Sequence, residues 1–305
     1  MQVAILSART GWHTDELCRA LTARGHIGRV LPYEALTASI AATAQVNAAG
    51  VPLLDCDAVL ARIIPNGSLE QIIYRVDSLH VLEQHGVPVL NSPRAIERCV
   101  DKFYTTALLQ RAGLPVPETV VCERLEDALT AVRILGDVIV KPLFGSMGHG
   151  LVRLSDPDTA FRVLRAFEQV RGVFYIQRVV PNPGRDLRIF VVGGRVLAAI
   201  ERQARDDDWR ANVTRGATAV PCTVPTGWAD LAVRAAAAVG ADYAGVDLLP
   251  SDAGKPYVIE VNGIPGWQGL QQATGCDVAG AIVDHLLDRI EHGPSGARTA
   301  GALHA

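Results

Sequence analysis

Two carboxylates and one amide in the last third of the chain have the residue types and the spacing of a metal site. Asp247 and Glu260 each interrupt an apolar run, and turn-forming residues at 250–256 separate the two runs. A hairpin centred near Ala253 places Asp247 opposite Glu260. Asn262 lies two residues beyond Glu260 and therefore faces the same side of the strand. Mg²⁺ takes one or two carboxylates and completes its shell with phosphate and water, so the pattern predicts such a site. The alternative is a solvent-facing hairpin with scattered acids.

A lysine and a group of glycines in the middle of the chain have the pattern of a phosphate site. An apolar strand ends at Lys141, and a loop with glycines at 145, 148 and 150 follows it. Glycines allow backbone N–H groups to approach an anion closely. The loop is not a Walker A motif, because no Gly-Lys-Ser/Thr follows it. A plain hairpin turn and a lysine at the rim of a sheet are the structural alternatives. A second lysine, Lys102, precedes this region.

Arginines occupy the stretch between the glycine-rich loop and the acidic hairpin, at Arg188, Arg202, Arg210 and Arg215. For the first two, the alternative is that they pair across strands with the carboxylates of Asp186 and Glu201. For Arg215 the alternative is a surface arginine. Lysines, arginines and Mg²⁺ gathered around phosphates are what phosphoryl transfer requires, because its catalysis depends on positioning and neutralising oxyanions.

The N-terminal elements that would support this chemistry alternate between strand and helix. Strands are expected at 2–6, 27–31, 58–64 and 87–91, and helices at 14–25 and 69–85. Thr14 is the expected cap of the first helix. A βαβ start predicts a parallel sheet. The absence of Gly-x-Gly-x-x-Gly argues against a dinucleotide site there.

The remaining elements are predicted from periodicity and turn residues. Helices are expected at 94–113, 125–135, 156–167, 228–239 and 278–290, and strands at 119–122, 137–141, 173–180, 185–192, 195–202, 244–249 and 257–261. Gly193 and Gly194 predict a tight hairpin. Residues 263–269 are expected as a loop. Residues 293–305 have little to bury and are expected to be a disordered tail.

Composition excludes several classes of protein. The 305 residues include 49% hydrophobic and 20% charged ones, and the net charge is −3. This charge gives no electrostatic reason to expect a nucleic-acid or membrane partner. No apolar run reaches the ~18 residues of a spanning helix. The six scattered cysteines and an N-terminus without a basic segment predict reduced thiols and a cytoplasmic location.

Over roughly residues 1–290 the order and spacing of these motifs resemble the ATP-grasp superfamily, and within it the RimK-like glutamate ligases. The pieces that carry the resemblance are Asp101-Lys102, Ile139-Val-Lys-Pro142 with the Gly145–Gly150 loop, Gly184-Arg-Asp-Leu-Arg188, Ala199-Ile-Glu-Arg202, Arg210-Ala-Asn-Val-Thr-Arg-Gly216, Val246-Asp247 and Ile259-Glu-Val-Asn262. The resemblance implies an α/β chain with α+β lobes in the ATP-grasp fold. The expected division is an N-terminal pre-ATP-grasp domain with a parallel sheet (1–93), a central lobe with a lid loop (94–180) and a C-terminal lobe with the metal site (181–292).

The same resemblance implies roles for individual residues. The ATP-binding set would be Lys102, Lys141, Gly145, Ser146, Gly148, Gln177, Arg178, Val179, Val180, Asp186, Arg210 and Asn212, in which 177–180 form the adenine hinge and Asp186 lies near the ribose. Arg188, Arg202 and Arg215 would contact the transferring phosphate or the acceptor carboxylate. Asp247, Glu260 and Asn262 would hold two Mg²⁺ or Mn²⁺ ions. For Gln177 an ordinary strand position is the alternative.

The implied reaction is formation of an amide through an acyl-phosphate, with ATP, L-glutamate and a carboxylate acceptor as substrates. The loops at 145–150 and 263–269 depart from the versions expected of ribosomal-protein modifiers, which favours a small coenzyme such as a tetrahydromethanopterin-type pterin as acceptor. The alternatives are a protein C-terminus such as that of a ribosomal protein, an amine other than glutamate, or a non-catalytic ATP-binding regulatory subunit. The resemblance also implies a homo-oligomer.

Overall fold

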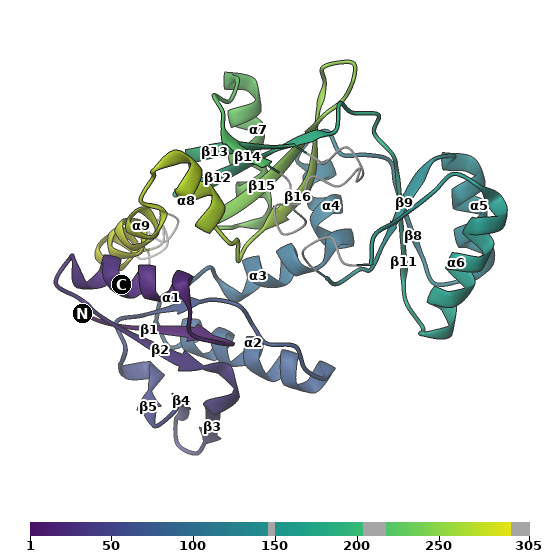
Figure 1. Cartoon of the computed structure of the whole chain (residues 1–305). Helices are drawn as coiled ribbons and strands as arrows, with labels where there is room; N and C mark the ends of the chain where they lie inside the picture. The colour runs from purple at the N-terminus through teal and green to yellow at the C-terminus, as the bar shows by residue number, and fades with distance from the viewer. Residues whose placement is uncertain (146–149, 204–217, 294–305) are drawn as a thin grey trace, which may run out of the picture.

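The computed structural model describes residues 1–145, 150–203 and 218–293. These residues form four sheets with helices packed against them (Figure 1). Several residues of the predicted site, together with the predicted tail from residue 294 on, lie outside the described residues; they are Ser146, Gly148, Arg210, Asn212 and Arg215. In the part of the chain that is described, no helix combines the length and the apolar character needed to cross a membrane.

The N-terminal sheet is parallel throughout, as its alternating pattern predicted. Its strand order is β2-β1-β6-β7, with β1 at Gln2–Ser7, β2 at Ile27–Pro32, β6 at Ala58–Ala61 and β7 at Val89–Leu90. Helices α1 (Trp12–Thr22) and α2 (Leu69–Gln84) follow β1 and β6. The prediction that Thr14 caps α1 is wrong. The N-cap is Gly11, and the Thr14 hydroxyl bonds back to the Gly11 N–H and carbonyl.

A small antiparallel sheet in the N-terminal region was not predicted. It consists of β3 (Leu36–Ile40), β4 (Ala44–Ala48) and β5 (Val51–Pro52), flanked by short 3₁₀ turns at Tyr33–Ala35 and Leu53–Asp55. All of β3 except its first residue is exposed. An exposed strand rich in small and polar residues lacks the alternation by which a half-buried strand is recognised.

Two helices occupy the range that the sequence predicts as one. Helix α3 spans Pro93–Val100 and α4 spans Lys102–Arg111. Asp101 lies between them in an extended conformation, and its carboxylate accepts a hydrogen bond from the Tyr104 N–H. An aspartate in this position caps the second helix, since its side chain satisfies a backbone donor that has no partner within the helix. Ser92 caps α3 by accepting a hydrogen bond from the Ala95 N–H, and Pro93 follows as its first residue.

The central sheet is antiparallel, and helices cover one of its faces. The strand order is β10-β9-β11-β8, with β8 at Thr119–Cys122, β9 at Val138–Lys141, β10 at Val152–Leu154 and β11 at Phe174–Arg178. Helices α5 (Leu125–Leu135) and α6 (Pro157–Gln169) pack with Val138, Val140, Phe174 and Ile176 into one apolar core. Because side chains alternate along a strand, Lys141, Tyr175 and Gln177 face the other side of the sheet.

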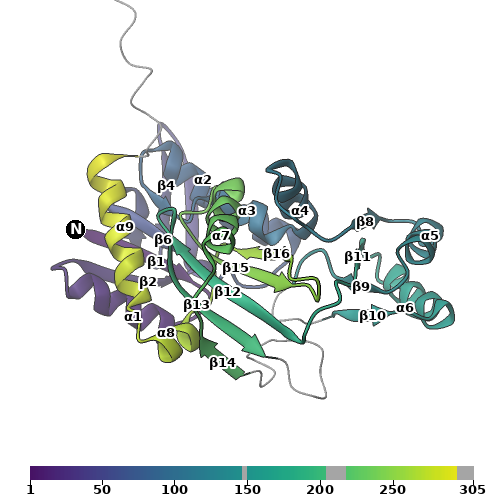
Figure 2. The same cartoon turned by 90° about the horizontal axis from the view of Figure 1, so that it is seen from above.

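The second antiparallel sheet contains the acidic hairpin. Its order is β14-β13-β12-β15-β16, with β12 at Arg185–Val192, β13 at Arg195–Gln203, β14 at Thr218–Pro221, β15 at Tyr243–Pro250 and β16 at Pro256–Asn262. Helix α7 (Thr226–Val239) covers one face. Figure 2 shows the α5–α6 body and the α1–α9 pair on opposite sides of this sheet.

The last helices close the fold against its first elements. Helix α8 (Gln268–Thr274) lies partly where a loop was expected, and α9 spans Val278–His292. Helix α9 packs along α1, and one hydrophobic core joins side chains of β1 and α1 with those of α9. An ion pair between Arg24 Nη2 and Asp284 Oδ2, at 2.8 Å, joins the two helices at the surface.

Asn91, directly after β7, ties the N-terminal sheet to the acidic hairpin. Its side chain is fully buried. Its Nδ2 donates to the carbonyls of Tyr243 (2.7 Å) and Gly263 (2.6 Å), and its Oδ1 accepts from the N–H groups of Asp242 (2.7 Å) and Tyr243 (3.1 Å). The amide therefore uses both donors and its acceptor, which makes it a satisfied buried polar group.

We expect Asn91→Ala to lower the free energy of unfolding by about 3 kcal/mol, because four hydrogen bonds are lost and buried backbone groups are left unsatisfied. Urea denaturation followed by circular dichroism measures the change. Asn66→Ala is the matched control, since Asn66 is exposed and its replacement should stay within about 0.5 kcal/mol of wild type. Equal urea midpoints for the two variants would contradict the stabilising role of the Asn91 side chain.

Candidate active site

The strand register of the second sheet brings the predicted charged residues onto one face. Asp186 lies opposite Arg202, Arg188 opposite Asp247, and Asp247 opposite Glu260. Residues that are directly opposite in an antiparallel pair share a face. Asn262 lies opposite Gly245, two residues before Asp247, and therefore faces the same side. The predicted opposition of Asp247 and Glu260 is confirmed.

Four of these side chains form a continuous, mostly buried ion-pair network. Arg188 binds Asp247 with two hydrogen bonds of 2.7 Å each, from Nε to Oδ1 and from Nη2 to Oδ2. Arg202 binds Asp186 in the same two-pronged manner at 2.6 and 2.8 Å, and its Nη2 also lies 2.9 Å from Oδ2 of Asp247. Two positive and two negative charges thus neutralise one another within the sheet face.

The cross-strand alternative for the arginines is correct for Arg202 and wrong for Arg188. Arg202 pairs with Asp186 as that alternative supposed. Arg188 instead reaches the neighbouring strand β15, because β12 is a central strand with partners on both sides. Glu201 pairs with Arg185 at 3.0 Å at the exposed end of the strand.

The two aspartates of the network differ in their electrostatics. For Asp247, burial favours the neutral acid, but Arg188 and Arg202 outweigh burial and lower its pKa. For Asp186, burial is the larger influence and raises its pKa, although Arg202 opposes the change. Asp247 has two guanidinium partners whereas Asp186 has one, which accounts for the difference.

Lys141 is held in a chain of polar side chains on the face of the central sheet opposite α5 and α6. Its side-chain Nζ donates to Gln177 Oε1 at 2.7 Å, and the residue is only 7% exposed. Gln177 Nε2 donates in turn to Thr119 Oγ1 (3.0 Å) and to the Tyr175 hydroxyl (3.1 Å). The Tyr175 hydroxyl meets Thr106 Oγ1 of α4 at 2.8 Å. Gln177 thus has a defined partner, which sequence reasoning did not identify.

The chain has only three lysines, and two of them lie at this site. Lys102 Nζ donates to the carbonyls of Leu143 (3.4 Å) and Gly145 (2.9 Å), at the start of the glycine-rich loop. Burial lowers the pKa of Lys141 to about 8 and also lowers the pKa of Lys102. In both cases the negative charge of Glu260 acts in the opposite direction. Helix α4, which begins at Lys102, also contacts β16, the strand that carries Glu260, so the acidic hairpin lies near the lysines.

The predicted adenine hinge, 177–180, already uses part of its main chain. The N–H of Arg178 donates to the Glu118 carbonyl (2.8 Å), and the N–H of Val179 donates to the Asp137 carbonyl (2.9 Å). The Val180 carbonyl accepts from Asn182 Nδ2 at 2.9 Å. Recognition of a base by this segment would fall to its remaining main-chain groups.

The side chains on the sheet face have the oxygen donors that a hard divalent cation prefers, and Arg188 and Arg202 bind one of them, Asp247, in this structure. Asp247 and Glu260 are adjacent carboxylates on one face, and Asn262 adds an amide oxygen that accepts only one described hydrogen bond, from the Ile264 N–H at 3.0 Å. Within residues 1–145, 150–203 and 218–293 no group of three or more His, Cys, Asp or Glu residues gathers as a metal site. Two carboxylates and an amide leave room for phosphate and water, which is the usual coordination of protein-bound Mg²⁺.

Sequence reasoning missed a buried arginine at the boundary between the N-terminal sheet and the hairpin. Arg62 follows β6 and is 2% exposed. Its Nη2 donates to the Pro265 carbonyl (2.9 Å), its Nη1 donates to the Tyr243 hydroxyl (3.2 Å), and its guanidinium lies 4.5 Å above the Trp267 ring. Arg62 thereby anchors the loop that follows Asn262. The sequence signal that could have identified Arg62 is a charged residue directly after a fully apolar strand.

His13 completes this boundary from helix α1. Its Nε2 accepts a hydrogen bond from the Trp267 N–H at 3.1 Å. Burial, and secondarily the charge of Arg62, lower the pKa of His13 to about 4. His13 is therefore neutral near pH 7, and it acts here as an acceptor rather than as a cation.

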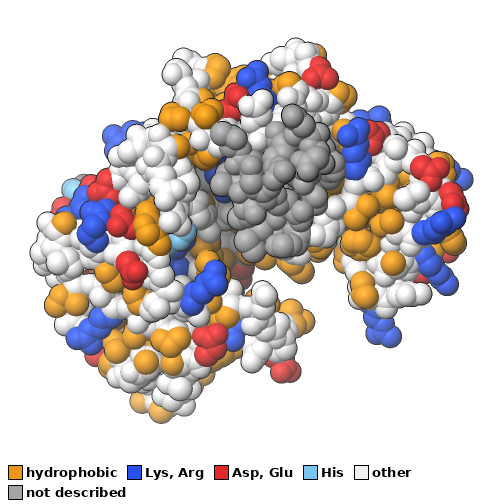
Figure 3. Space-filling view, in the orientation of Figure 1, with side chains coloured by type: hydrophobic (Ala, Val, Ile, Leu, Met, Phe, Trp, Pro, Cys, Tyr) orange, Lys and Arg blue, Asp and Glu red, His pale blue; other side chains and the backbone are white. Residues whose placement is uncertain are grey.

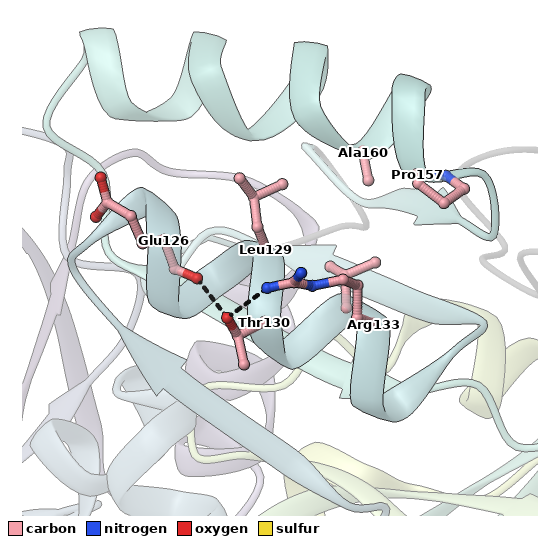
Figure 4. Close-up of a pocket in the computed structure, with 7 residues that line it drawn as sticks. Glu126, Leu129, Thr130, Arg133, Pro157 and Ala160 are labelled. Atoms are coloured by element: carbon pink, nitrogen blue, oxygen red, sulfur yellow. Dashed lines mark hydrogen bonds between the residues drawn. The ribbon is translucent and has the colours of Figure 1, made fainter.

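A separate cavity of about 320 Å³ lies between α5 and α6 (Figure 4). It is lined by Glu126, Leu129, Thr130, Val132, Arg133, Pro157 and Ala160, and two of the side-chain groups, those of Thr130 and Arg133, are already hydrogen-bonded to each other. Lys141 faces the other side of the central sheet, so this cavity is separate from the lysine site. Figure 3 shows the α5–α6 body at one side of the molecule, with basic side chains, which here are arginines, interspersed among Asp and Glu on the visible face.

Comparison with known proteins gives a consistent result. A family model described as the RimK-like ATP-grasp domain matches residues 99–286, and one described as the RimK PreATP-grasp domain matches residues 1–96. The chain is 34% identical to "Tetrahydromethanopterin:alpha-L-glutamate ligase" of Methanosarcina acetivorans, over 90% of this chain and 95% of that one. It is 35% identical to "Probable alpha-L-glutamate ligase" of Trichodesmium erythraeum, over 98% and 100% respectively.

The fold has a solved counterpart in the ATP-grasp ligase PsnB, whose structure was determined with a minimal precursor variant, Mg and ADP. The TM-score is 0.72 at 23% identity, over 94% of this chain and 98% of that one. The two lysines and the carboxylates of the second sheet, taken with these likenesses, define an ATP-dependent carbon–nitrogen ligase. The chain belongs to the RimK-like ATP-grasp family.

We expect nucleotide affinity to fall as the pH rises above about 8. The pKa of Lys141 is depressed by burial, so the free protein loses this positive charge above pH 8, and an anionic ligand must then be bound together with a proton. Each further pH unit should weaken binding of a non-hydrolysable ATP analogue by up to about tenfold. Calorimetric titrations between pH 7.5 and 9.5 measure this.

Two variants test whether this pH dependence comes from Lys141 or from another titrating group. Lys141→Met should bind the analogue weakly and lose the pH dependence between 7.5 and 9.5. Lys255→Met should behave as wild type, because Lys255 is exposed in the turn between β15 and β16. A wild-type affinity that stays level across this range, or an unchanged slope in Lys141→Met, would be inconsistent with a role for the Lys141 charge.

Proposed function

We propose that the protein is an α-L-glutamate ligase that joins the amino group of L-glutamate to a carboxylate of a small coenzyme and converts ATP to ADP and phosphate. The observation that carries the proposal is that two groups of side chains lie near each other: the oxygen donors of Asp247, Glu260 and Asn262 on one sheet face, and the lysines Lys102 and Lys141, with helix α4 of Lys102 in contact with β16 of Glu260. This arrangement suits ATP with its cations, because the lysines can neutralise the phosphates while the oxygen donors bind the cations.

The proposed reaction has two steps. An oxygen of the acceptor carboxylate attacks the γ-phosphorus of ATP, and the bond to the bridging oxygen breaks to release ADP. The glutamate nitrogen then attacks the acyl carbon, phosphate leaves, and the nitrogen loses its proton to give the amide. Neither step needs a nucleophile from the protein. The protein has to position the substrates and exclude water from the acyl-phosphate.

Within this proposal each part of the site has a task. Lys102 and Lys141 neutralise the ATP phosphates, residues 177–180 hold the adenine, and Asp186 lies toward the ribose. Arg188 and Arg202 stabilise the transferring phosphate or orient the acceptor carboxylate. Outside the described residues, the same proposal assigns ATP contacts to Ser146, Gly148, Arg210 and Asn212, and a catalytic contact to Arg215; Gly145, which is described, belongs to the ATP set.

The proposed cations are two Mg²⁺ or Mn²⁺ ions held by Asp247, Glu260 and Asn262. Such ions offset negative charge on the phosphate oxygens. The protein's part is to present oxygen ligands from a rigid sheet and to leave the remaining positions to the nucleotide.

The preferred acceptor is a tetrahydromethanopterin-type pterin. The name of the relative from Methanosarcina acetivorans, 34% identical over 90% of this chain, supports this choice. So do the loops at 145–150 and 263–269, which depart from the pattern expected of ribosomal-protein modifiers. A protein C-terminus is the second candidate, because other relatives carry only the name "Probable alpha-L-glutamate ligase". We further propose a cytoplasmic homo-oligomer.

The test is ADP release by the purified protein with ATP, Mg²⁺ and L-glutamate, with each candidate acceptor supplied in turn and the product identified by mass spectrometry. We expect a product heavier than the pterin acceptor by one glutamate residue, and ADP release that requires both substrates. Glutamylation only of a ribosomal-protein C-terminal peptide would support the second candidate. ADP release with another amine in place of glutamate would refute the glutamate assignment.

Two variants tie this activity to the sheet face. Glu260→Ala should lower kcat by at least about a hundredfold, because a carboxylate of the proposed ion site is lost. Asp252→Ala is the control: Asp252 is exposed at the far end of the same hairpin, and its replacement should leave turnover near wild type. Comparable turnover in the two variants would contradict the proposed role of Glu260 as an ion ligand.

A further inference from the structure

The carboxylate of Asp247, a proposed ion ligand, already accepts hydrogen bonds from two arginines. Arg188 covers both carboxylate oxygens at 2.7 Å, and Arg202 adds a third contact at 2.9 Å to Oδ2. An ionised carboxylate offers about four acceptor sites, so three charge-assisted contacts leave little for another ligand. A cation approaching Asp247 therefore meets a carboxylate whose charge is neutralised and whose oxygens are engaged.

The two arginines differ in how firmly they are held. Arg202 is anchored on its other side by two bonds to Asp186, and its side chain is 7% exposed. The Arg188 side chain is 16% exposed, and its described ionic partner is Asp247. Among the described residues, moving Arg188 breaks one ion pair, whereas moving Arg202 breaks two. Arg188 is thus the arginine that can leave at lower cost.

A nucleotide would change this balance. Its phosphates bring negative charge to the space between the sheet face and the two lysines, where the charge of Glu260 already acts on Lys102 and Lys141. Phosphate oxygens are good bidentate partners for a guanidinium, so Arg188 can exchange the Asp247 carboxylate for phosphate. Of its described ionic contacts, the Asp247 carboxylate then keeps only the one with Arg202, so Arg188 no longer offsets its negative charge and the lone pairs that Arg188 occupied are free for a cation.

We propose that Arg188 is an internal counter-ion that suppresses cation binding at Asp247 until nucleotide phosphates draw it away. This inference rests on the proposed roles of Asp247 and of ATP. Cation and nucleotide then bind as a coupled pair: each raises the affinity for the other, because both favour the arrangement in which Arg188 has left Asp247. Arg202, held by Asp186, remains in place as the fixed positive charge of the face.

The decisive measurement is Mn²⁺ binding without nucleotide, followed by the electron paramagnetic resonance signal of free Mn²⁺. We expect Arg188→Met to bind Mn²⁺ at least about tenfold more tightly than wild type. A merely structural arginine would give the opposite sign, since loosening the face should weaken binding. Unchanged or weaker Mn²⁺ binding in a folded Arg188→Met protein would overturn the proposal.

Three further variants make the result specific. Arg185→Met is the matched control on the same strand, because Arg185 is exposed and pairs with Glu201; it should leave Mn²⁺ affinity unchanged. The double variant Arg188→Met with Asp247→Asn should lose the gain. A gain that persists without the Asp247 carboxylate would place the new binding elsewhere and refute the proposal.

Arg188→Lys provides a second route if Arg188→Met does not fold. It keeps the charge but cannot make the two-pronged contact, so its Mn²⁺ affinity should rise by a smaller factor than that of the methionine variant. An affinity equal to or below that of wild type would again contradict the proposal. None of these measurements uses glutamate or an acceptor, so their outcome is independent of which substrates the enzyme joins.

Discussion

The arrangement of the site depends on the register of strands β12, β15 and β16. Side chains alternate between the two faces of a sheet, so a slip of one residue in any of these strands would send Asp247 or Glu260 into the apolar side under α7. The register is held by that same apolar side, where Val246, Leu248 and Val261 are fully buried. The hydrophobic face and the polar face are therefore specified by one pattern, and neither can be altered without the other.

Buried polar groups around this sheet fix the orientation of the N-terminal sheet relative to it, because hydrogen bonds are directional and apolar contacts are not. Asn91 grips the start of β15 and the end of β16 through four hydrogen bonds, and Arg62 anchors the loop beyond Asn262. Each group would be costly to bury without its partners. A shifted packing of the N-terminal sheet would leave them unsatisfied, so they select the native one.

Local patterns were sufficient to predict much of this protein from its sequence. The period of two, interrupted by turn residues at 250–256, predicted the hairpin and the pairing of Asp247 with Glu260, because register follows from alternation and turn position. The alternation of strands and helices predicted the parallel sheet. The division of 93–111 into α3 and α4 was missed, since helical periodicity continues across Asp101 and only the capping contact marks the boundary.

Contacts between distant segments were not predictable from local patterns. Arg62 and Trp267 are separated by about two hundred positions, and nothing in either neighbourhood identifies the other. Arg188 has aspartates within reach both along its own strand and on β15, and only the three-dimensional strand order decides between them. The contact of Lys141 with Gln177 likewise depends on the pairing of β9 with β11.

The packing of α9 against α1 has a consequence for how the chain is made. The core that holds Leu17 and Leu21 of α1 is completed by Ile282, Val283 and Leu286, which the ribosome adds more than 250 residues later. Domains generally fold in the order of synthesis, but this N-terminal region emerges with part of its apolar surface uncovered. That surface stays available to chaperones, or to another nascent chain, until α9 has been synthesised. Helix α1 is therefore synthesised well before the segment that completes its packing.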